Sequence, residues 1–147
     1  DRLEIAGRYK VPQIIAPGGL TVVDAKTWSH APKSFEGRDF RPHNRLITCA
    51  ALNPLERGEA AKVIGNKLMK SKGPTAFIMP HGGFDDWDRE GEWAFDRDAI
   101  NHFYKEIKNI LREPIEFYEI EQNINDPEFT DLALKIFDEW SEKGIIK

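Results

Sequence analysis

Short apolar runs alternate along this chain with longer segments that have a helical pattern. The expected strands cover residues 14–15, 45–51, 75–79 and 115–120, and the expected helices cover residues 54–68, 98–111 and 127–143. In each helical segment apolar residues recur three and four positions apart, which is the stripe of an amphipathic helix. Strands that alternate with helices indicate a mostly parallel sheet. The sequence therefore predicts an α/β fold with about four strands and flanking helices.

Cap residues mark where the helices begin. Asn53 is followed by proline and, three residues later, by Glu56, which is the pattern of a capping box. Asp96 or Asp98 starts the next helix, and Asp126, again followed by proline, caps the last one. These signals set the expected helix starts independently of the apolar stripes.

Residues 20–44 show neither period. The segment holds Trp28, Phe35, Phe40 and several charged residues, and structureless loops of this length are uncommon inside a compact domain. Its aromatic and charged content suits a contact surface. We expect a long interface loop within a single domain of residues 1–147, making a homodimer or interdomain contact.

Composition restricts the function classes. The 147 residues are 40% hydrophobic, enough for one core, and the net charge of −4 argues against a nucleic-acid groove or an anionic membrane surface. No apolar run approaches the roughly 20 residues of a membrane-spanning helix. Cys49 is the single cysteine, so an internal disulfide is excluded and a cytoplasmic setting is expected.

The N-terminal residues predict a longer protein. Residues 1–10 have the pattern of the end of a helix, no strand precedes them, and the chain begins with Asp1 instead of methionine. We expect the chain to be the C-terminal part of a two-domain protein.

Three loops should meet beyond the carboxyl ends of the parallel strands, where such sheets bind ligands. They are Pro17-Gly18-Gly19, the loop 81–88 and the loop 121–126. His43 and Asn44 precede an expected strand, so they reach this edge only if the long loop folds back.

Each group in these loops has a functional and a structural interpretation. His81 is a general acid/base, oriented by Asp85 or Asp88, or a loop histidine. The acids of 85–88 hold a divalent cation or form a solvated loop, and we assign no metal because no tight ligand spacing is present. Gly82 and Gly83 cradle phosphate or form a flexible turn.

The remaining polar and aromatic groups are equally open. Asn123, Asn125 and Asp126 contact a ligand, or turn and cap chemistry accounts for Asp126 fully and for Asn125 in part. Trp87 and Trp93 stack on a base or pack as a lid, and packing is the safer interpretation.

The loops also carry a likeness to a known family. VPQIIAPGGL, PHNRLITCAALNP, GPTAFIMPHGGFDDWD, AFDRDA and IEQNINDPEF, in this order, resemble the second domain of the Tm-one-like ATP-binding family. The resemblance covers nearly the whole chain. It implies two Rossmann-like domains, a dimer, and a nucleotide or phosphorylated small molecule bound between domains, with ATP, and Mg with it, as the possible cofactor. The matching positions are Pro17, Gly18, His43, Asn44, Pro80, Gly83, Phe84, Asn125, Asp126 and Pro127; Gly19 and Gly82 lie in the same glycine loops.

Several positions depart from the pattern of that family. The family usually carries arginine where this chain has Ala51 and Gly82, and serine where it has Asp85. It also carries Asp, Asn and Gly where this chain has Thr21, Asp24 and Lys26. Losing two arginines and gaining carboxylates weakens the case for a phosphate at this part of the site.

Three functions compete. The first is binding of a nucleotide or phosphorylated small molecule. The second is an enzyme that acts on a small polar metabolite with His81 as general acid/base. The third is an interaction module that docks a partner through residues 20–44.

Overall fold

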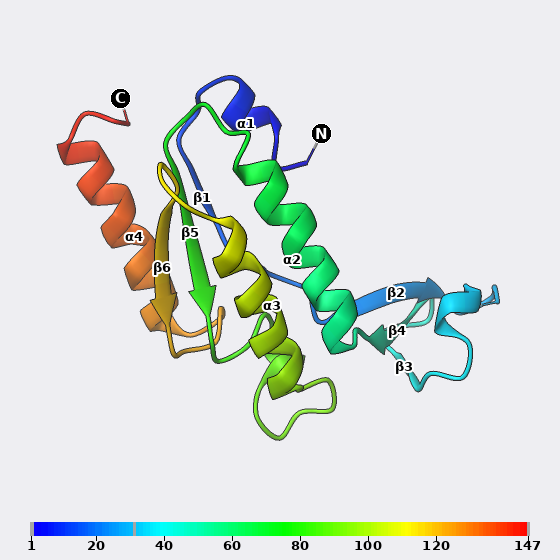
Figure 1. Cartoon of the computed structure of the whole chain (residues 1–147). Helices are drawn as coiled ribbons and strands as arrows, with labels where there is room; N and C mark the ends of the chain where they lie inside the picture. The colour runs from blue at the N-terminus through cyan, green and yellow to red at the C-terminus, as the bar shows by residue number, and fades with distance from the viewer. Residues whose placement is uncertain (1, 31, 147) are drawn as a thin grey trace.

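A three-stranded parallel sheet forms the centre of the molecule. The computed structural model describes residues 2–30 and 32–146, so residues 1, 31 and 147, which fall in the expected N-terminal helix end, in the 20–44 segment and at the C-terminus, lie outside the described residues. The strands are β1 (Gln13–Ile15), β5 (Thr75–Pro80) and β6 (Glu116–Ile120), in the order β1-β5-β6 (Figure 1). All six residues of β5 are buried, as expected for a central parallel strand.

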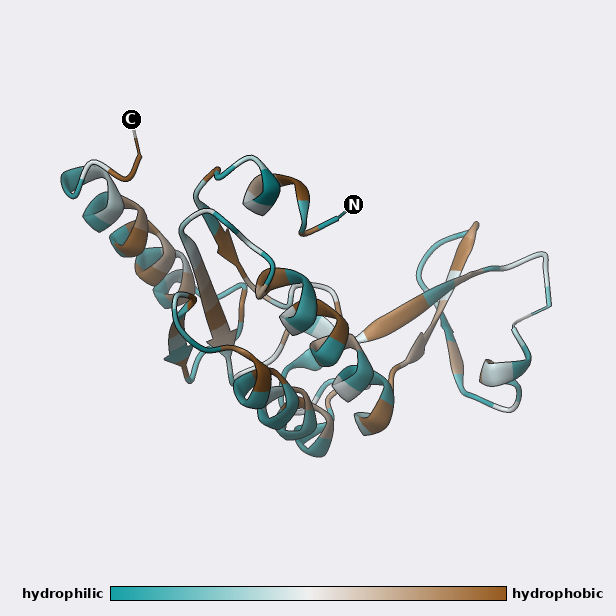
Figure 2. Cartoon of the chain, turned by 45° about the horizontal axis from the view of Figure 1, so that its top comes forward, coloured by the Kyte–Doolittle hydropathy of each residue, from teal (hydrophilic) through white to brown (hydrophobic). Residues whose placement is uncertain are grey.

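Helices cover both faces of this sheet. The helices α2 (Pro54–Leu68) and α3 (Arg97–Ile110) pack on one face, and α4 (Pro127–Glu142) packs on the other (Figure 1). Successive side chains of β5 serve the two faces in turn: Phe77 and Met79 join the core under α2 and α3, whereas Ala76 and Ile78 join the core under α4. In Figure 2 the long helices carry hydrophilic and hydrophobic residues in turn along their length, as amphipathic helices do. The predicted α/β class is confirmed.

Short elements complete the parallel part. The four-residue helix α1 (Ile5–Arg8) lies within the segment that the sequence predicts as a helix end. A single 3-10 turn, η2 (Asp86–Asp88), follows β5, and Asp85 accepts a hydrogen bond from the Trp87 amide at its start.

A second, antiparallel sheet projects from the side of the molecule (Figure 1). It contains β2 (Val22–Lys26), β3 (Phe40–Pro42) and β4 (Ile47–Ala51) in the order β2-β4-β3, with the 3-10 turn η1 (Lys33–Phe35) between β2 and β3. We call residues 22–51 the arm.

The arm corrects two predictions. Residues 20–44 are not a structureless loop, because they contribute β2 and β3. The strand expected at 45–51 does not join the parallel sheet: it lies at the centre of the antiparallel one, which leaves three parallel strands instead of about four. A short apolar run does not specify its partner strands, since pairing depends on neighbours distant in sequence. The role of the segment as an interface stays a prediction.

The cap residues behave differently from one another. Asn53 and Glu56 form the predicted capping box at α2, and Asp96, not Asp98, caps α3 by accepting from the Ala99 amide at 3.0 Å. Asp126 occupies the cap position of α4 but makes no cap hydrogen bond with its side chain. Its carboxylate accepts instead from the Asn123 amide and from Arg89. Of the helices in the described ranges, none has the length and apolar character needed to cross a membrane.

Candidate functional site

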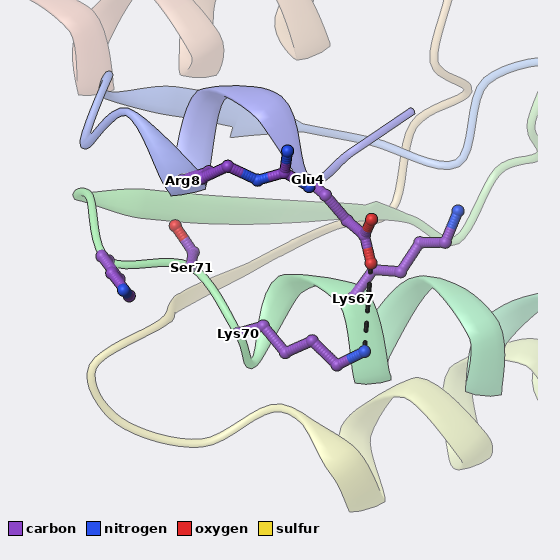
Figure 3. Close-up of a pocket in the computed structure, with 6 residues that line it drawn as sticks. Glu4, Arg8, Lys67, Lys70 and Ser71 are labelled. Atoms are coloured by element: carbon purple, nitrogen blue, oxygen red, sulfur yellow. Dashed lines mark ion pairs between the residues drawn. The ribbon is translucent and has the colours of Figure 1, made fainter. Parts of the chain in front are cut away.

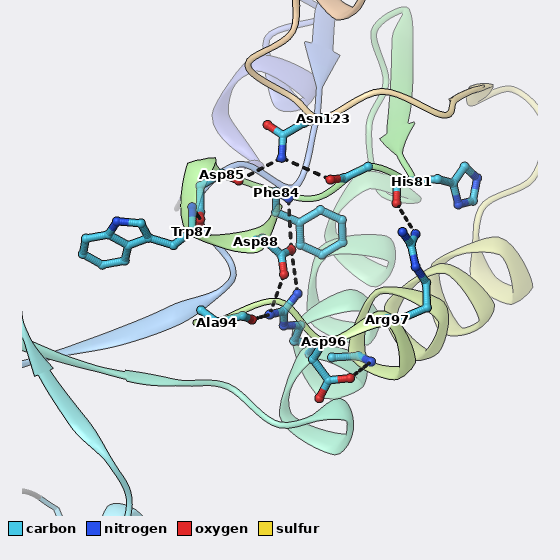
Figure 4. A network of polar contacts seen from close by, with 12 residues as sticks. His81, Phe84, Asp85, Trp87, Asp88, Ala94, Asp96, Arg97 and Asn123 are labelled. Carbon is cyan, nitrogen blue, oxygen red and sulfur yellow. Dashed lines mark hydrogen bonds and ion pairs between the residues drawn. The ribbon is translucent and has the colours of Figure 1, made fainter. Parts of the chain in front are cut away.

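The three loops expected to meet at the carboxyl edge of the sheet do meet. The Gly19 amide donates to the Phe84 carbonyl at 3.0 Å, which joins the first loop to the second. The Gly82 amide donates to the Gln122 carbonyl at 3.1 Å, which joins the second to the third. The Asn123 side chain, 2% exposed, donates to the carbonyls of Gly82 and Asp85 and locks the same junction (Figure 4).

Gly82 and Gly83 are required by this close packing. A Cβ at Gly82 would lie 2.5 Å from the Gln122 carbonyl carbon, and a Cβ at Gly83 would overlap the Asp88 carbonyl oxygen. Gly83 also has φ +121°, a conformation that L side chains rarely adopt. The Gly82 amide is already bonded to Gln122, and the Phe84 amide donates to the Asp88 carboxylate. Amides that are bonded within the loop are unavailable to a phosphate, which favours the turn interpretation for Gly82; a phosphate contact by Gly83 stays a prediction.

Asp88 is buried beneath this loop. Its carboxylate faces the guanidinium of Arg57 at 2.8 Å and 3.1 Å, and both side chains are fully buried (Figure 4). Arg57 also donates to the Ala94 carbonyl and lies 5.6 Å from the centre of the Phe84 ring. Burial raises the pKa of Asp88, and the Arg57 guanidinium opposes that rise. The predicted catalytic role of Asp88 is not supported, because its carboxylate is sealed from solvent and holds the loop to α2.

His81 faces a different polar cluster. Its Nε2 atom lies 3.2 Å from the Glu119 carboxylate, and its ring packs edge-on against Tyr104. Lys108 donates to Glu119 at 2.6 Å and lowers the pKa of that carboxyl. In Figure 4 the His81 ring lies on the opposite side of the loop from Asp85 and Trp87. The structure therefore does not bring His81 together with Asp85 or Asp88, as the predicted acid/base group requires.

An open cleft of about 450 Å³ lies between the loop that follows β5 and the arm. Its lining residues come from the first loop, the arm, the η2 turn and the third loop: Gly19, Val22, Asp24, His43, Cys49, Asp85, Asp86, Trp87 and Asn125. The long segment does fold back, which was the condition for His43 to reach this edge. The His43 ring packs edge-on against Trp87 with 5.2 Å between centroids, and Trp87 lies 5.7 Å from Trp93.

The cleft is acidic. It contains the carboxylates of Asp24, Asp85 and Asp86, and none of its described lining residues is lysine or arginine. Hydrogen bonds from Asn125 and Arg89 lower the pKa of Asp86, so this carboxylate is charged at neutral pH. An anion brought alone into this cleft would meet like charge.

Cys49 lines the cleft without being a nucleophile. Its thiol donates to Asp24 at 3.0 Å. Burial, and then this hydrogen bond, raise the pKa of Cys49 to about 12. The thiolate is the reactive form, so the structure supports the predicted inert thiol.

The other predicted binding residues divide into two groups. Gly19, His43, Asp85 and Asn125 line the cleft. The others do not line it. Pro17 and Phe84 are buried, and a Cβ at Gly18 would lie 3.3 Å from the Ile124 side chain. Asn44 closes a turn of the arm by accepting from the Leu46 and Ile47 amides, and Asp126 pairs with Arg89 at 2.8 Å.

Sequence reasoning missed two contributors to this site. Asp24 and Val22 lie on β2, which has no periodic signal. Asn123, a predicted ligand contact, is instead the buried bridge between two loops. Within the described ranges, no group of three or more His, Cys, Asp and Glu residues is placed to hold a metal ion.

A second hollow, of about 240 Å³, has the opposite charge. It lies at the C-terminal end of α2 and is lined by Glu4, Arg8, Lys67, Lys70, Ser71 and Lys72 (Figure 3). Lys70 lies 3.9 Å from Glu4, and Lys67 donates to the Arg2 carbonyl. These lysines lie at the C-terminal end of α2, where the helix dipole favours cations. Because α2 begins beside the arm and ends here, the two hollows lie at opposite ends of the helix.

Comparison with known proteins identifies the family. Residues 1–141 match the model described as the Uncharacterised protein family (UPF0261) C-terminal domain, so the chain belongs to this family. It is 41% identical over 146 residues to a UPF0261 protein of Brucella melitensis, covering 99% of this chain and 35% of that protein. It is 35% identical over 132 residues to a UPF0261 protein of Clostridium tetani, covering 88% of this chain and 32% of that protein. The chain spans about a third of the length of these curated relatives.

Proposed function

We propose that this member of the UPF0261 C-terminal domain family binds a nucleotide or a phosphorylated small molecule through the uncharged, hydroxyl-bearing end of that ligand. One observation carries the proposal: the cleft at the carboxyl edge of a parallel sheet combines carboxylates with the aromatic pair of His43 and Trp87, and its described lining includes no lysine or arginine. Ligands of α/β sheets bind at this edge.

The lining chemistry fits a nucleoside better than a phosphate. Carboxylates such as Asp24 and Asp85 accept hydrogen bonds from ribose hydroxyls, as the acidic residue of dinucleotide-binding folds does. Trp87 offers a ring for stacking on a base. The phosphates, by contrast, need cations. We assign that role to Mg²⁺ or to the remainder of the longer proteins in this family, in agreement with the missing arginines at Ala51 and Gly82.

Thermal unfolding with a series of ligands tests this division. Adenosine at about ten times its dissociation constant should stabilise the chain by about 1.4 kcal/mol, which corresponds to a rise of roughly 4 °C in Tm. ATP without Mg²⁺ should give a smaller rise, and inorganic phosphate none. Trp87→Ala should abolish the adenosine shift, whereas Lys72→Ala, in the basic hollow, should keep it. Absence of a shift with adenosine and with Mg-ATP would refute the proposal, and an equal response to phosphate alone would refute the orientation.

An enzyme that acts on a small polar metabolite is the second candidate, and the position of His43 favours it. This histidine, not His81, shares the cleft with Asp24 and Asp85, so it is the group that could exchange a proton with a bound ligand. A reaction that loses one limb of its pH–rate profile in His43→Gln but not in His81→Gln would establish this candidate. A profile altered only by His81→Gln would exclude His43 as the acid/base.

A further inference from the structure

The strand β1 presents an open edge. It is the outer strand of the parallel sheet, paired with β5 on one side only. The Gln13 amide donates to the Pro74 carbonyl on the β5 side, at 3.0 Å. Because the backbone groups of a parallel strand alternate between its two neighbours, Ile14 directs its N–H and C=O to the open side.

An apolar groove runs beside this edge. It has a volume of about 430 Å³ and lies between β1 and the C-terminal part of the chain, with this lining: Val11, Pro12, Ile14, Phe137, Trp140, Ile145 and Ile146. No charged side chain is among these described lining residues. Val11, just before β1, is 51% exposed, and Phe137, on α4, is 47% exposed, so apolar surface of the groove faces solvent. In Figure 1 α4 lies beside β6, at the far side of the sheet from β1, so the groove remains open between β1 and this helix.

We propose that this edge and groove are the docking surface for the part of the protein that precedes the C-terminal domain in the longer relatives. That part adds a strand next to β1 and covers the groove with apolar side chains. The family model describes a C-terminal domain, and the chain spans only about a third of the length of its relatives, so about two thirds of such a protein is available to supply the covering segment.

The small size of the surface favours an occupant from the same polypeptide. Within the three residues of β1, Ile14 is the one that directs backbone groups to the open edge, so two β1 edges meeting across a two-fold axis would form very few hydrogen bonds. A stable complex of free partners buries about 800 Å² on each side. A covalently linked segment needs less contact, because its effective concentration is in the millimolar range.

Hydrogen exchange measured on this chain and on the full-length Brucella melitensis relative tests the proposal. In this chain the Ile14 amide should exchange rapidly, while the Ala76 amide on β5 should be protected. In the longer protein the amide that aligns with Ile14 should exchange at least about 100-fold more slowly. Equal exchange at this position in the two proteins would overturn the proposal. A dimer of this chain in sedimentation experiments, with Ile14 protected, would also overturn it, because the occupant would then be a second copy.

A fluorescent dye that binds apolar surface gives an independent readout. This chain should bind the dye, and Phe137→Lys should reduce binding severalfold. Leu134→Lys is the matched control, since Leu134 is exposed on the same helix but does not line the groove. Strong binding of the dye by the full-length relative in its folded state would contradict a covered groove.

Discussion

Replacing Asp88 with asparagine removes one charge of the buried Arg57–Asp88 pair while keeping nearly the same shape. Both side chains are fully buried, and two hydrogen bonds, of 2.8 and 3.1 Å, join them. The asparagine carbonyl oxygen can still accept from the Phe84 amide, but its NH2 group cannot accept from Arg57, so the substitution removes one hydrogen bond together with the charge. The Arg57 guanidinium would then remain in the core without a counterion.

The expected cost is large. Breaking a buried pair by removing one partner costs about 3–5 kcal/mol, because the remaining charge has lost its compensation. For a chain of this size, such a loss should lower Tm by roughly 10 °C. Replacing both residues, as in Arg57→Met with Asp88→Leu, should recover at least about half of the loss, since no buried charge is left.

Urea unfolding followed by tryptophan fluorescence at pH 7 measures these differences. Asp86→Asn is the matched control: Asp86 lies in the same turn, but its carboxylate is largely exposed and pairs with Arg89, so its loss should change the unfolding midpoint far less. A loss below about 1 kcal/mol for Asp88→Asn would refute the reasoning. It would mean that water reaches the pair in solution.

Three further predictions concern stability and reactivity. Hydrogen bonding from Arg38 lowers the pKa of Glu56, so the stability that this carboxylate supplies is present above its unfolded pKa of about 4.3 and is lost as the pH falls through the folded pKa. In Glu56→Gln, acid titration should therefore show a shallower loss of folding stability, and at pH 7 the broken capping box should cost about 1 kcal/mol. Cys49, with its pKa raised to about 12, should react with a thiol reagent at pH 8 at least roughly 100-fold more slowly in the folded chain than in urea, and equal rates would contradict its burial. Gly83→Ala should cost more than about 2 kcal/mol of unfolding free energy, whereas Gly91→Ala, which also has a positive φ but open space around its Cβ position, should cost about 1 kcal/mol; similar costs would show that crowding at Gly83 is relieved.

Local patterns predicted the parallel part of the fold well. The apolar run at 75–79 became the central strand, the alternating segment 115–120 became an edge strand, and the capping box at Asn53 marked the start of α2. The three loops of the carboxyl edge were also predicted to meet, because strand direction alone places them there. Each of these features is encoded by residues close together in sequence.

The composition of the site was harder to predict. His81 directly follows β5 and Asp88 ends the η2 turn, yet one faces Glu119 and the other is buried against Arg57. His43 reaches the cleft because the arm folds back over the η2 turn. A sequence of neighbouring polar residues does not show which of them face the same space, since that depends on contacts between distant elements.

The sequence by itself determined the α/β class, the helix start at Asn53, and the edge of the sheet where a ligand site should lie. Those features follow from periodicity, cap chemistry and strand direction, which act over a few residues. Only the tertiary structure decided that 45–51 pairs with β2 and β3 and that the cleft is acidic. Strand pairing and the burial of charge are set by the free energy of the whole packed chain, so a local pattern leaves them open.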